Sequence, residues 1–288
     1  MKNLRSKNII VVETHKVRLD KMETCFDSLS VEEPLEIKIA SAAEDFAPQT
    51  IAVTMRTPGH DEELAVGFLF AESIIQSFVQ VESVAQSKCN GVVVSLKPGV
   101  NPELTKLERH SFVSSSCGVC GKKSVESVLS RTEIDTSSDS FDVEVAVFAT
   151  MSRSLRLMQS DFDTTGGIHA SALFTTEGRL LDLREDVGRH NALDKLIGSM
   201  LMRNCLPQSE AILFLSGRAS FELVQKAVNA GIRMVASVGA PSSLAVQLAS
   251  DAGITLVGFV REDRFNIYCG EERIRTIRSE CSQVQSAC

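Results

Sequence analysis

The chain has 288 residues, of which 43% are hydrophobic, and its formal net charge is −7. This length is sufficient for one large domain or two of moderate size, each burying a core. The acidic balance argues against a nucleic-acid-binding protein, which would present a basic surface, although local arginine clusters could still bind phosphate.

The N-terminal segment lacks the features of a targeting signal. Its continuous apolar run, residues 9–12, is too short for the core of a signal peptide. No stretch of the sequence approaches the ~18 consecutive apolar residues of a transmembrane helix. Eight cysteines without a secretory signal indicate reduced thiols, not a disulfide framework. We therefore predict a soluble, cytoplasmic protein.

The first third of the chain is predicted to contain strands and one strong helix. Apolar and polar residues alternate over 35–40, 50–56 and 91–97, as they do in half-buried strands. After the break at Pro58, acidic residues in a first helical turn start a helix that we predict from Asp61 to about Ile75.

The polar stretch 132–142 is the best linker candidate, and a helix over 143–158 follows it. We therefore predict an N-terminal part over 1–135, a C-terminal part over 136–278 and a tail over 279–288.

The C-terminal part is predicted to alternate strands and helices with short turns. Such alternation is typical of βαβ units and a mixed, mainly parallel sheet, which makes the fold class α/β. After the helix over 143–158, we predict a hairpin over 169–176 and 179–183. Helices over 189–203, 219–229 and 242–252 then alternate with strands over 211–215, 233–238, 255–260 and 265–269.

The run 114–123 is the most informative segment, because it places Cys117 and Cys120 three residues apart and follows each with a glycine. The glycines let the turn move and let another backbone approach closely. A short helix predicted over 122–129 would place its N-terminus beside the thiols. Its dipole and the two lysines that close the run both favour thiolate, which makes this a site for sulfur chemistry.

Several chemistries are compatible with this Cys-x-x-Cys pair, besides simple burial of the thiols. A structural zinc site would need two more ligands at matching spacing, and no second pair exists in the sequence. A thioredoxin-like dithiol needs a strand before the pair and a helix after it, and both are predicted here. A persulfide carrier would accept sulfur on one thiolate and use the other to resolve or shield it. The motif by itself leaves these functions open.

Three turns after the predicted strands carry ligand-binding chemistry: 216–220, 237–243 and 259–264. In such sheets ligands bind beyond the carboxyl ends of the strands, where helix N-termini present free N–H groups. Arginine suits phosphate, and a carboxylate suits the paired donors of a guanine edge. Each turn taken singly could be a plain connection with a capping serine or a surface ion pair. Together they predict an anionic, nucleotide-like ligand, but neither the Walker loop nor the dinucleotide fingerprint is present.

The run 184–195 is the densest polar segment of the chain. It indicates a helix start with Asp186 or Gly188 near the cap. His190 and Asp194 would then share one helix face and could form a hydrogen bond. The sequence assigns no catalytic role to them or to His169.

The segment 165–171 resembles part of the zinc-deaminase signature, His-x-Glu followed by Pro-Cys-x-x-Cys. Here Ser171 stands where the catalytic glutamate would be, and the cysteine pair comes before His169 in the chain. Deamination is therefore not predicted.

Taken together, these segments resemble the FdhD/NarQ family of formate dehydrogenase accessory proteins, which are sulfurtransferases of molybdenum cofactor maturation. The most specific matches are the Cys-Gly-Val-Cys-Gly string and the run Glu-Asp-Val-Gly-Arg-His-Asn-Ala-Leu-Asp-Lys. Further matches lie at residues 32–37, 57–69, 165–170, 216–218 and 258–261. Ser73, where glycine is commoner in the family, and the tail after Arg278 depart from the pattern.

The resemblance implies a sulfur relay. A cysteine desulfurase would load sulfur onto Cys117 as a persulfide, and Cys120 would assist the transfer or guard the persulfide. The sulfur would then pass to molybdenum in bis-molybdopterin guanine dinucleotide, before this cofactor enters the catalytic subunit of formate dehydrogenase. The cofactor is thus a bound substrate, and no protein-ligated metal is expected.

The resemblance also implies a cytidine-deaminase-like fold, a three-layer α/β/α sandwich, and a homodimer. The residues expected to contact the guanine dinucleotide are Phe259, Val260, Arg261, Glu262, Asp263 and Arg264, and the turn analysis adds Arg218. Two other functions stay open. One is a non-catalytic chaperone that holds the nucleotide, and the other is a thioredoxin-like redox protein that cycles a Cys117–Cys120 disulfide.

Overall fold

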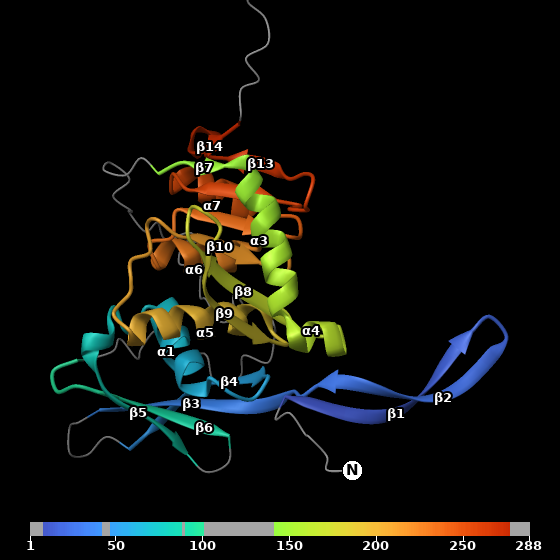
Figure 1. Cartoon of the computed structure of the whole chain (residues 1–288). Coiled ribbons are helices and arrows are strands. Elements are labelled where there is room, and N and C mark those ends of the chain that lie inside the picture. Colours follow the sequence, from blue (N-terminus) through green and yellow to red (C-terminus); the bar gives the residue numbers. More distant parts are fainter. Residues whose placement is uncertain (1–7, 42–46, 88–89, 101–140, 277–288) are drawn as a thin grey trace, which may run out of the picture.

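The computed structural model describes residues 8–41, 47–87, 90–100 and 141–276 (Figure 1). Cys117 and Cys120, the strand and helix predicted around them, and the predicted boundary at 135/136 lie outside these residues. Among the described residues, no helix combines the length and the apolar character that crossing a bilayer requires.

The larger sheet contains six strands in the order β13-β12-β11-β10-β8-β9. Its strands are β8 (His169–Phe174), β9 (Leu180–Asp186), β10 (Ile212–Leu215), β11 (Met234–Ser237), β12 (Thr255–Gly258) and β13 (Asn266–Cys269). The pairs β10–β11 and β11–β12 are parallel, whereas β12–β13, β10–β8 and β8–β9 are antiparallel. The predicted mixed α/β sheet is confirmed, but the expectation that it is mainly parallel is wrong, because three of its five pairs are antiparallel. The antiparallel pairs come from the β8–β9 hairpin, which joins the sheet through β8, and from the returning edge strand β13.

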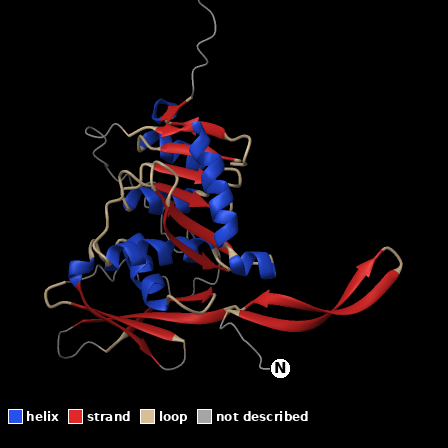
Figure 2. Cartoon of the chain, in the orientation of Figure 1, coloured by secondary structure: helices blue, strands red, loops and turns tan. Residues whose placement is uncertain are grey.

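Helices cover both faces of this sheet, which confirms the three-layer arrangement (Figure 2). Helix α3 (Val145–Met158) packs on one face through Phe148, Met151 and Leu155. Helices α5 (Arg189–Met202), α6 (Phe221–Asn229) and α7 (Ser243–Asp251) pack on the other. The short strands β7 (Val143–Glu144) and β14 (Ile274–Arg275) pair beside the sheet.

The N-terminal part is a four-stranded sheet in the order β4-β3-β6-β5, covered by helix α1. The elements are β3 (Glu33–Ser41), β4 (Gln49–Arg56), α1 (Asp61–Ala71), the 3-10 turn η1 (Phe78–Gln80), β5 (Val81–Ser87) and β6 (Gly91–Leu96). Helix α1 ends at Ala71 and not at about Ile75, because Ser73 adopts a left-handed φ of 58°. Ile75 is nevertheless buried, so the apolar pattern extends past the end of the helix.

The two parts share a helical layer in which α1 crosses α5 at glycines. A Cβ atom on Gly67 would lie 1.9 Å from the carbonyl oxygen of Asp194, and one on Gly198 would lie 1.9 Å from that of Glu63. The two helix backbones are therefore in direct contact, and any side chain at either position would force them apart. The order of layers is the small sheet, α1, α5, the large sheet and α3.

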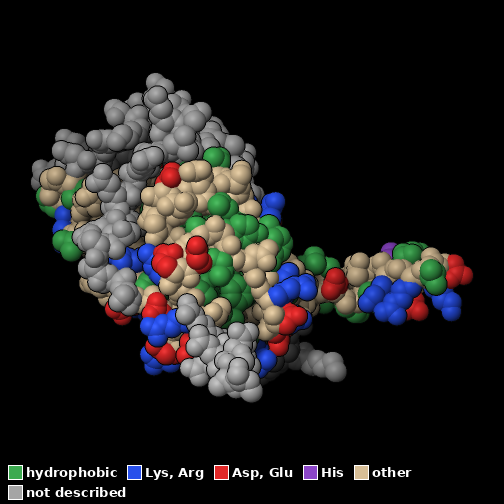
Figure 3. All heavy atoms as spheres, turned by 90° about the horizontal axis from the view of Figure 1, so that it is seen from above, with side chains coloured by type: hydrophobic (Ala, Val, Ile, Leu, Met, Phe, Trp, Pro, Cys, Tyr) green, Lys and Arg blue, Asp and Glu red, His purple; other side chains and the backbone are tan. Residues whose placement is uncertain are grey.

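A two-stranded antiparallel arm, β1 (Ile9–Arg18) and β2 (Lys21–Ser30), extends away from the body (Figures 1 and 3). Its base meets α4 (Ser160–Thr165) through a 2.8 Å hydrogen bond between the Ser30 and Thr165 hydroxyls. Val17, Met22 and Phe26 share one face by register and are 63%, 68% and 74% exposed. An isolated two-stranded ribbon is marginal in water.

Candidate functional site

The turns that follow β10, β11 and β12 lie side by side at one edge of the large sheet. The Gly239 amide donates to the Gly217 carbonyl at 2.8 Å, and the Phe259 amide donates to the Gly239 carbonyl at 3.1 Å. The Ser242 amide donates to the Ala219 carbonyl at 3.0 Å. The structure thus brings together the three segments that the sequence analysis singled out, and helices α6 and α7 begin at this edge.

Glycine at position 239 is required by the close contact between two of these turns. A Cβ atom there would lie 2.8 Å from the Cα of Arg218, which is backbone and cannot give way. The same contact holds the Arg218 side chain, which is exposed, next to the turn that follows β11.

The turn after β12 is closed by the Arg261 amide, which donates to the Arg264 carbonyl at 2.8 Å. The Arg261 guanidinium donates to the Val238 carbonyl at 2.8 Å, so this side chain also joins two turns. Phe259 is 41% exposed and has a left-handed φ of 55°, an uncommon conformation for phenylalanine.

The remaining predicted site residues differ in what they can contact. Glu262, Asp263 and Arg264 are exposed, and Glu262 forms an ion pair with Arg153 at 3.0 Å. Val260 is fully buried in the core below α3, so that its side chain supports the turn and cannot touch a ligand.

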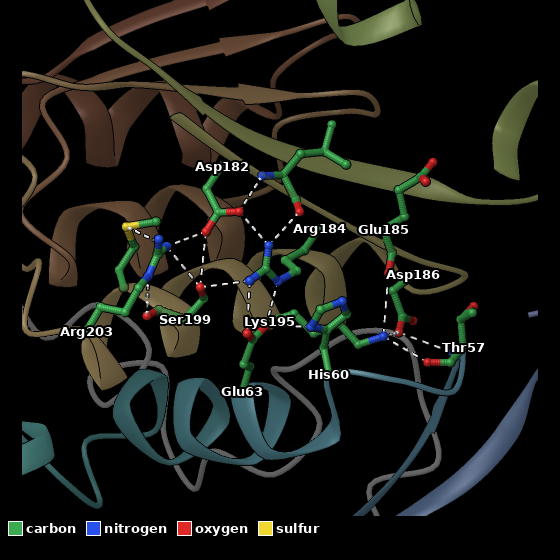
Figure 4. Close-up of polar contacts among 12 residues, drawn as sticks. Thr57, His60, Glu63, Asp182, Arg184, Glu185, Asp186, Lys195, Ser199 and Arg203 are labelled. Carbon is green, nitrogen blue, oxygen red and sulfur yellow. Dashed lines mark hydrogen bonds and ion pairs between the residues drawn. The ribbon is translucent and has the colours of Figure 1, made fainter. Parts of the chain in front are cut away.

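Below this edge, Asp186 and Lys195 form an ion pair at 2.7 Å with side chains that are 0% and 1% exposed (Figure 4). Asp186 also accepts from the Thr57 amide at 3.1 Å and the Gly188 amide at 2.8 Å. Lys195 donates to the Thr57 carbonyl at 2.8 Å. Burial raises the pKa of Asp186, although Lys195 opposes this effect. This pair joins the segment before α1 to the start of α5.

A second network joins α1 to β9 (Figure 4). The Arg184 guanidinium donates to both carboxylate oxygens of Glu63, at 2.5 and 2.9 Å, and to the Ser199 hydroxyl at 2.8 Å. Burial by itself would raise the pKa of Glu63, but hydrogen bonds from Arg184 and His60 lower it to about 2. The run 184–195 therefore holds the N-terminal and C-terminal parts of the molecule together, through Arg184 in this network and through Asp186 and Lys195 in the first.

The predicted hydrogen bond between His190 and Asp194 is not formed. Lys226 donates to both oxygens of the Asp194 carboxylate, at 2.6 and 2.5 Å. His190 lies instead 3.4 Å from the Ser220 hydroxyl and 3.8 Å from the Glu222 carboxylate. The helix start was correctly predicted, with Gly188 as the N-cap, but the partners come from α6 and could not be read from local spacing.

Glu185 gives a pH-dependent contribution to stability. Burial raises its pKa to about 7, the charges of Asp161 and Asp163 add to this effect, and its Oε1 has no hydrogen-bond partner among the described residues. Because the pKa is higher in the folded state, the folded state binds more protons. The contribution is therefore favourable at low pH and is lost as the pH rises through about 7.

We expect Glu185→Gln to raise the free energy of unfolding by about 1 kcal/mol at pH 8, after allowance for solvent screening. At pH 5 the same change should leave the free energy of unfolding nearly unaltered. Urea unfolding followed by circular dichroism at both pH values measures this, with the exposed Glu82→Gln as control. Equal effects of Glu185→Gln at the two pH values would contradict the assignment.

A model of the FdhD/NarQ family matches residues 30–275, which include both networks and all three turns. The chain belongs to the FdhD/NarQ family. A protein of Streptomyces avermitilis is 45% identical over 280 residues, which cover 93% of this chain and 96% of that protein. A protein of Sulfolobus acidocaldarius is 40% identical, with 91% and 99% covered. Both are named sulfur carrier protein FdhD.

A solved structure has the same fold. It is the crystal structure of a candidate formate dehydrogenase accessory protein from Desulfotalea psychrophila, and the match covers 93% of this chain and 100% of that one. The TM-score is 0.73 at 24% sequence identity. The family resemblance found in the sequence is confirmed, and the α/β fold of this FdhD/NarQ chain agrees with that of the solved protein.

Proposed function

We propose that this chain is a sulfur carrier and sulfurtransferase that acts in the maturation of formate dehydrogenase. Its cysteine pair at 117 and 120 is the sulfur-handling motif, and relatives that match nearly the whole chain are named sulfur carrier proteins. The observation that carries the proposal is that one chain combines this motif with a sheet edge suited to a nucleotide. We place the activity in the cytoplasm, where thiols stay reduced.

In the first step, the Cys117 thiolate attacks the outer sulfur of a persulfide on a cysteine desulfurase. A sulfur–sulfur bond forms at Cys117, the bond within the desulfurase persulfide breaks, and the desulfurase cysteine leaves as a thiolate. The outer sulfur would then pass to the molybdenum of bis-molybdopterin guanine dinucleotide: the sulfur–sulfur bond at Cys117 breaks, the metal gives two electrons and is oxidised accordingly, the sulfur becomes sulfide, and Cys117 leaves as a thiolate. Cys120 assists this transfer or shields the persulfide. The catalytic subunit of formate dehydrogenase receives the cofactor.

The cofactor is a substrate that binds at the edge formed by the three turns. Arg218, Arg261 and Arg264 supply cationic donors for its phosphates, and Asp263 supplies an acceptor for the paired donors of guanine. Glu262 is already paired with Arg153, so Asp263 is the carboxylate of this turn that we assign to the base.

We expect Asp263→Asn to weaken binding of GDP about tenfold and to abolish the preference for GDP over ADP, because the amide loses a charged acceptor. Isothermal titration with both nucleotides measures this, and Asp251→Asn, an exposed position at the far end of α7, is the control. Unchanged GDP affinity in Asp263→Asn would contradict the assignment.

A non-catalytic chaperone that holds the guanine nucleotide is the second candidate. It is favoured by the fact that the described turns 216–220, 237–243 and 259–264 carry the donors and acceptors assigned to the nucleotide. A chaperone would support maturation with both thiols removed, whereas a carrier would not.

We further propose that the chain forms a homodimer through the apolar face of the β1–β2 arm, with a second copy covering Val17, Met22 and Phe26. We expect Phe26→Ser to raise the dimer dissociation constant about tenfold or more, since a buried phenylalanine contributes roughly 1.5–3 kcal/mol. Sedimentation velocity measures this, with Lys16→Ser on the opposite face as control. A mass distribution unchanged by Phe26→Ser would exclude the arm as the dimer surface.

A further inference from the structure

A cavity of about 270 Å³ lies at the edge of the large sheet opposite the three turns. It is lined in part by Leu206 and Pro207, which precede β10, and by Asn229 and Ala230, which precede β11. Neighbouring parallel strands start at one edge and end at the other, so the cavity is separate from the turns that follow β10, β11 and β12. Its volume is below that of most small-molecule sites and suits a single large side chain.

The C-terminal ends of three helices border this cavity. Phe70 in the last turn of α1, Leu201 in the last turn of α5 and Asn229 at the end of α6 all line it. Each helix is followed by a residue with a left-handed φ, and these residues are Ser73 at 58°, Asn204 at 54° and Gly231 at 71°. A helix C-terminus carries a partial charge of about −0.5, so the three ends together make the cavity electronegative.

The described residues that line the cavity include no charged side chain to balance these helix ends. The last turns of α1 and α5 contain no basic residue, and the C-cap of α1 is the acidic Glu72. Lys226, in the last turn of α6, is already paired with Asp194 at 2.5 Å. Arg203, the C-cap of α5, is paired with Asp182. The complement of this cavity is therefore a cation, and the net charge of −7 adds a general attraction for a basic surface.

The lining favours a guanidinium over an ammonium group. Phe70 and Phe78 are half-buried and contribute aromatic rings to the cavity. A guanidinium is planar and weakly hydrated, so it stacks on aromatic rings more readily than an ammonium does. Gln76 and Asn204 are exposed lining residues, and their side-chain oxygens can accept hydrogen bonds from its N–H groups.

We propose that the cavity is a docking site for an arginine side chain carried by a basic segment of a partner protein. The guanidinium would lie against the rings of Phe70 and Phe78, with its charge at the three helix ends. Such a site goes beyond the proposed function, since it requires neither the cysteine pair nor the nucleotide edge.

The test titrates the full-length protein with Nα-acetyl-arginine methylamide and with the corresponding citrulline and leucine compounds. It follows the amide NMR signals of Asn204 and Asn229. The arginine probe should shift both signals and bind about tenfold more tightly than the citrulline probe, which has nearly the same shape but no charge. Equal affinity for the arginine probe and either neutral probe would overturn the site, as would the absence of a shift.

Two variants test the charge and the ring separately. Gln76→Lys places a cation in the cavity and should weaken the arginine probe about tenfold or more, with little effect on the citrulline probe. Gln247→Lys adds the same charge at an exposed position of α7, so it is the control and should change neither. Phe78→Leu keeps the apolar contact and should weaken the arginine probe about three- to fivefold. Wild-type affinity in both Gln76→Lys and Phe78→Leu would overturn the site.

Two further measurements distinguish a partner protein from other sources of the arginine. Free L-arginine should bind less tightly than the blocked probe, because its carboxylate adds a negative charge. Tighter binding of L-arginine would contradict a protein partner and indicate a small-molecule site. Sedimentation velocity of the chain alone should be the same for Gln76→Lys and the wild type. A shift of Gln76→Lys toward the monomer would show that a second copy supplies the arginine, which would also contradict a separate partner.

Discussion

Replacing Cys117 with alanine is expected to lower formate dehydrogenase activity by at least about a hundredfold in cells that depend on this chain. Removal of the nucleophile abolishes the covalent route that depends on it. The measurement is formate oxidation in extracts of cells complemented with the wild type or the variant. Thermal unfolding and GDP binding of Cys117→Ala should match the wild type, because the change removes a single sulfur atom.

The matched control is Cys205→Ala, which removes an exposed free thiol after helix α5. It should leave maturation at the wild-type level. Full formate dehydrogenase activity with Cys117→Ala would remove the carrier role and leave the chaperone as the remaining candidate.

Lys195→Met is expected to lower the free energy of unfolding by about 3–5 kcal/mol. The change leaves the Asp186 carboxylate buried without its counter-charge, and it also removes the donor to the Thr57 carbonyl. Because this pair joins the segment before α1 to the start of α5, the loss should affect both parts of the molecule in one transition. Urea unfolding monitored by circular dichroism measures the change.

Lys38→Met is the matched control, since Lys38 pairs with Glu36 at 2.9 Å on the surface. An exposed pair of this kind contributes about 0–1 kcal/mol. The double variant Asp186→Asn with Lys195→Met should recover part of the loss, because it removes the unpaired charge. If Lys195→Met lowered the free energy of unfolding no more than Lys38→Met does, the buried Asp186–Lys195 pair would contribute no more to stability than an ion pair on the surface.

Much of the C-terminal part could be predicted because its local signals agree with its tertiary structure. Strands β10, β11 and β12 are short apolar runs separated by amphipathic helices and small-residue turns, a pattern that has few alternatives. The convergence of the turns followed from the rule that parallel strands end at one edge. The hydrogen bonds that join Gly217, Gly239 and Phe259 show the physical basis of that prediction.

The arm could not be predicted, because its exposed strands lack a buried face. In β1 and β2, apolar residues occur on both sides of the ribbon, so no clean alternation marks either strand.

The length of α1 was overpredicted because the apolar pattern continues past the residue at which the helix ends. Ile74 and Ile75 keep the apolar pattern beyond Ala71 although the backbone has left the helix.

The roles within the polar run 184–195 depended on contacts across the fold. Its helix cap and core-facing leucines follow from local rules. Its polar partners, however, come from distant segments: Asp186 accepts a hydrogen bond from Thr57, and Arg184 and Asp194 form ion pairs with Glu63 and Lys226. Sequence spacing carries no signal for such pairs. Arg189 was part of the run 184–195, but the lack of a hydrogen-bond partner for its Nε atom among the described residues became evident with the surrounding structure.

The most direct test of the sulfur carrier is the intact mass of the purified protein after incubation with a cysteine desulfurase and cysteine. The account predicts the added mass of one sulfur atom on Cys117, lost on treatment with a thiol reductant and absent from Cys117→Ala. A wild-type protein that gains no sulfur under conditions in which the desulfurase turns over would contradict it.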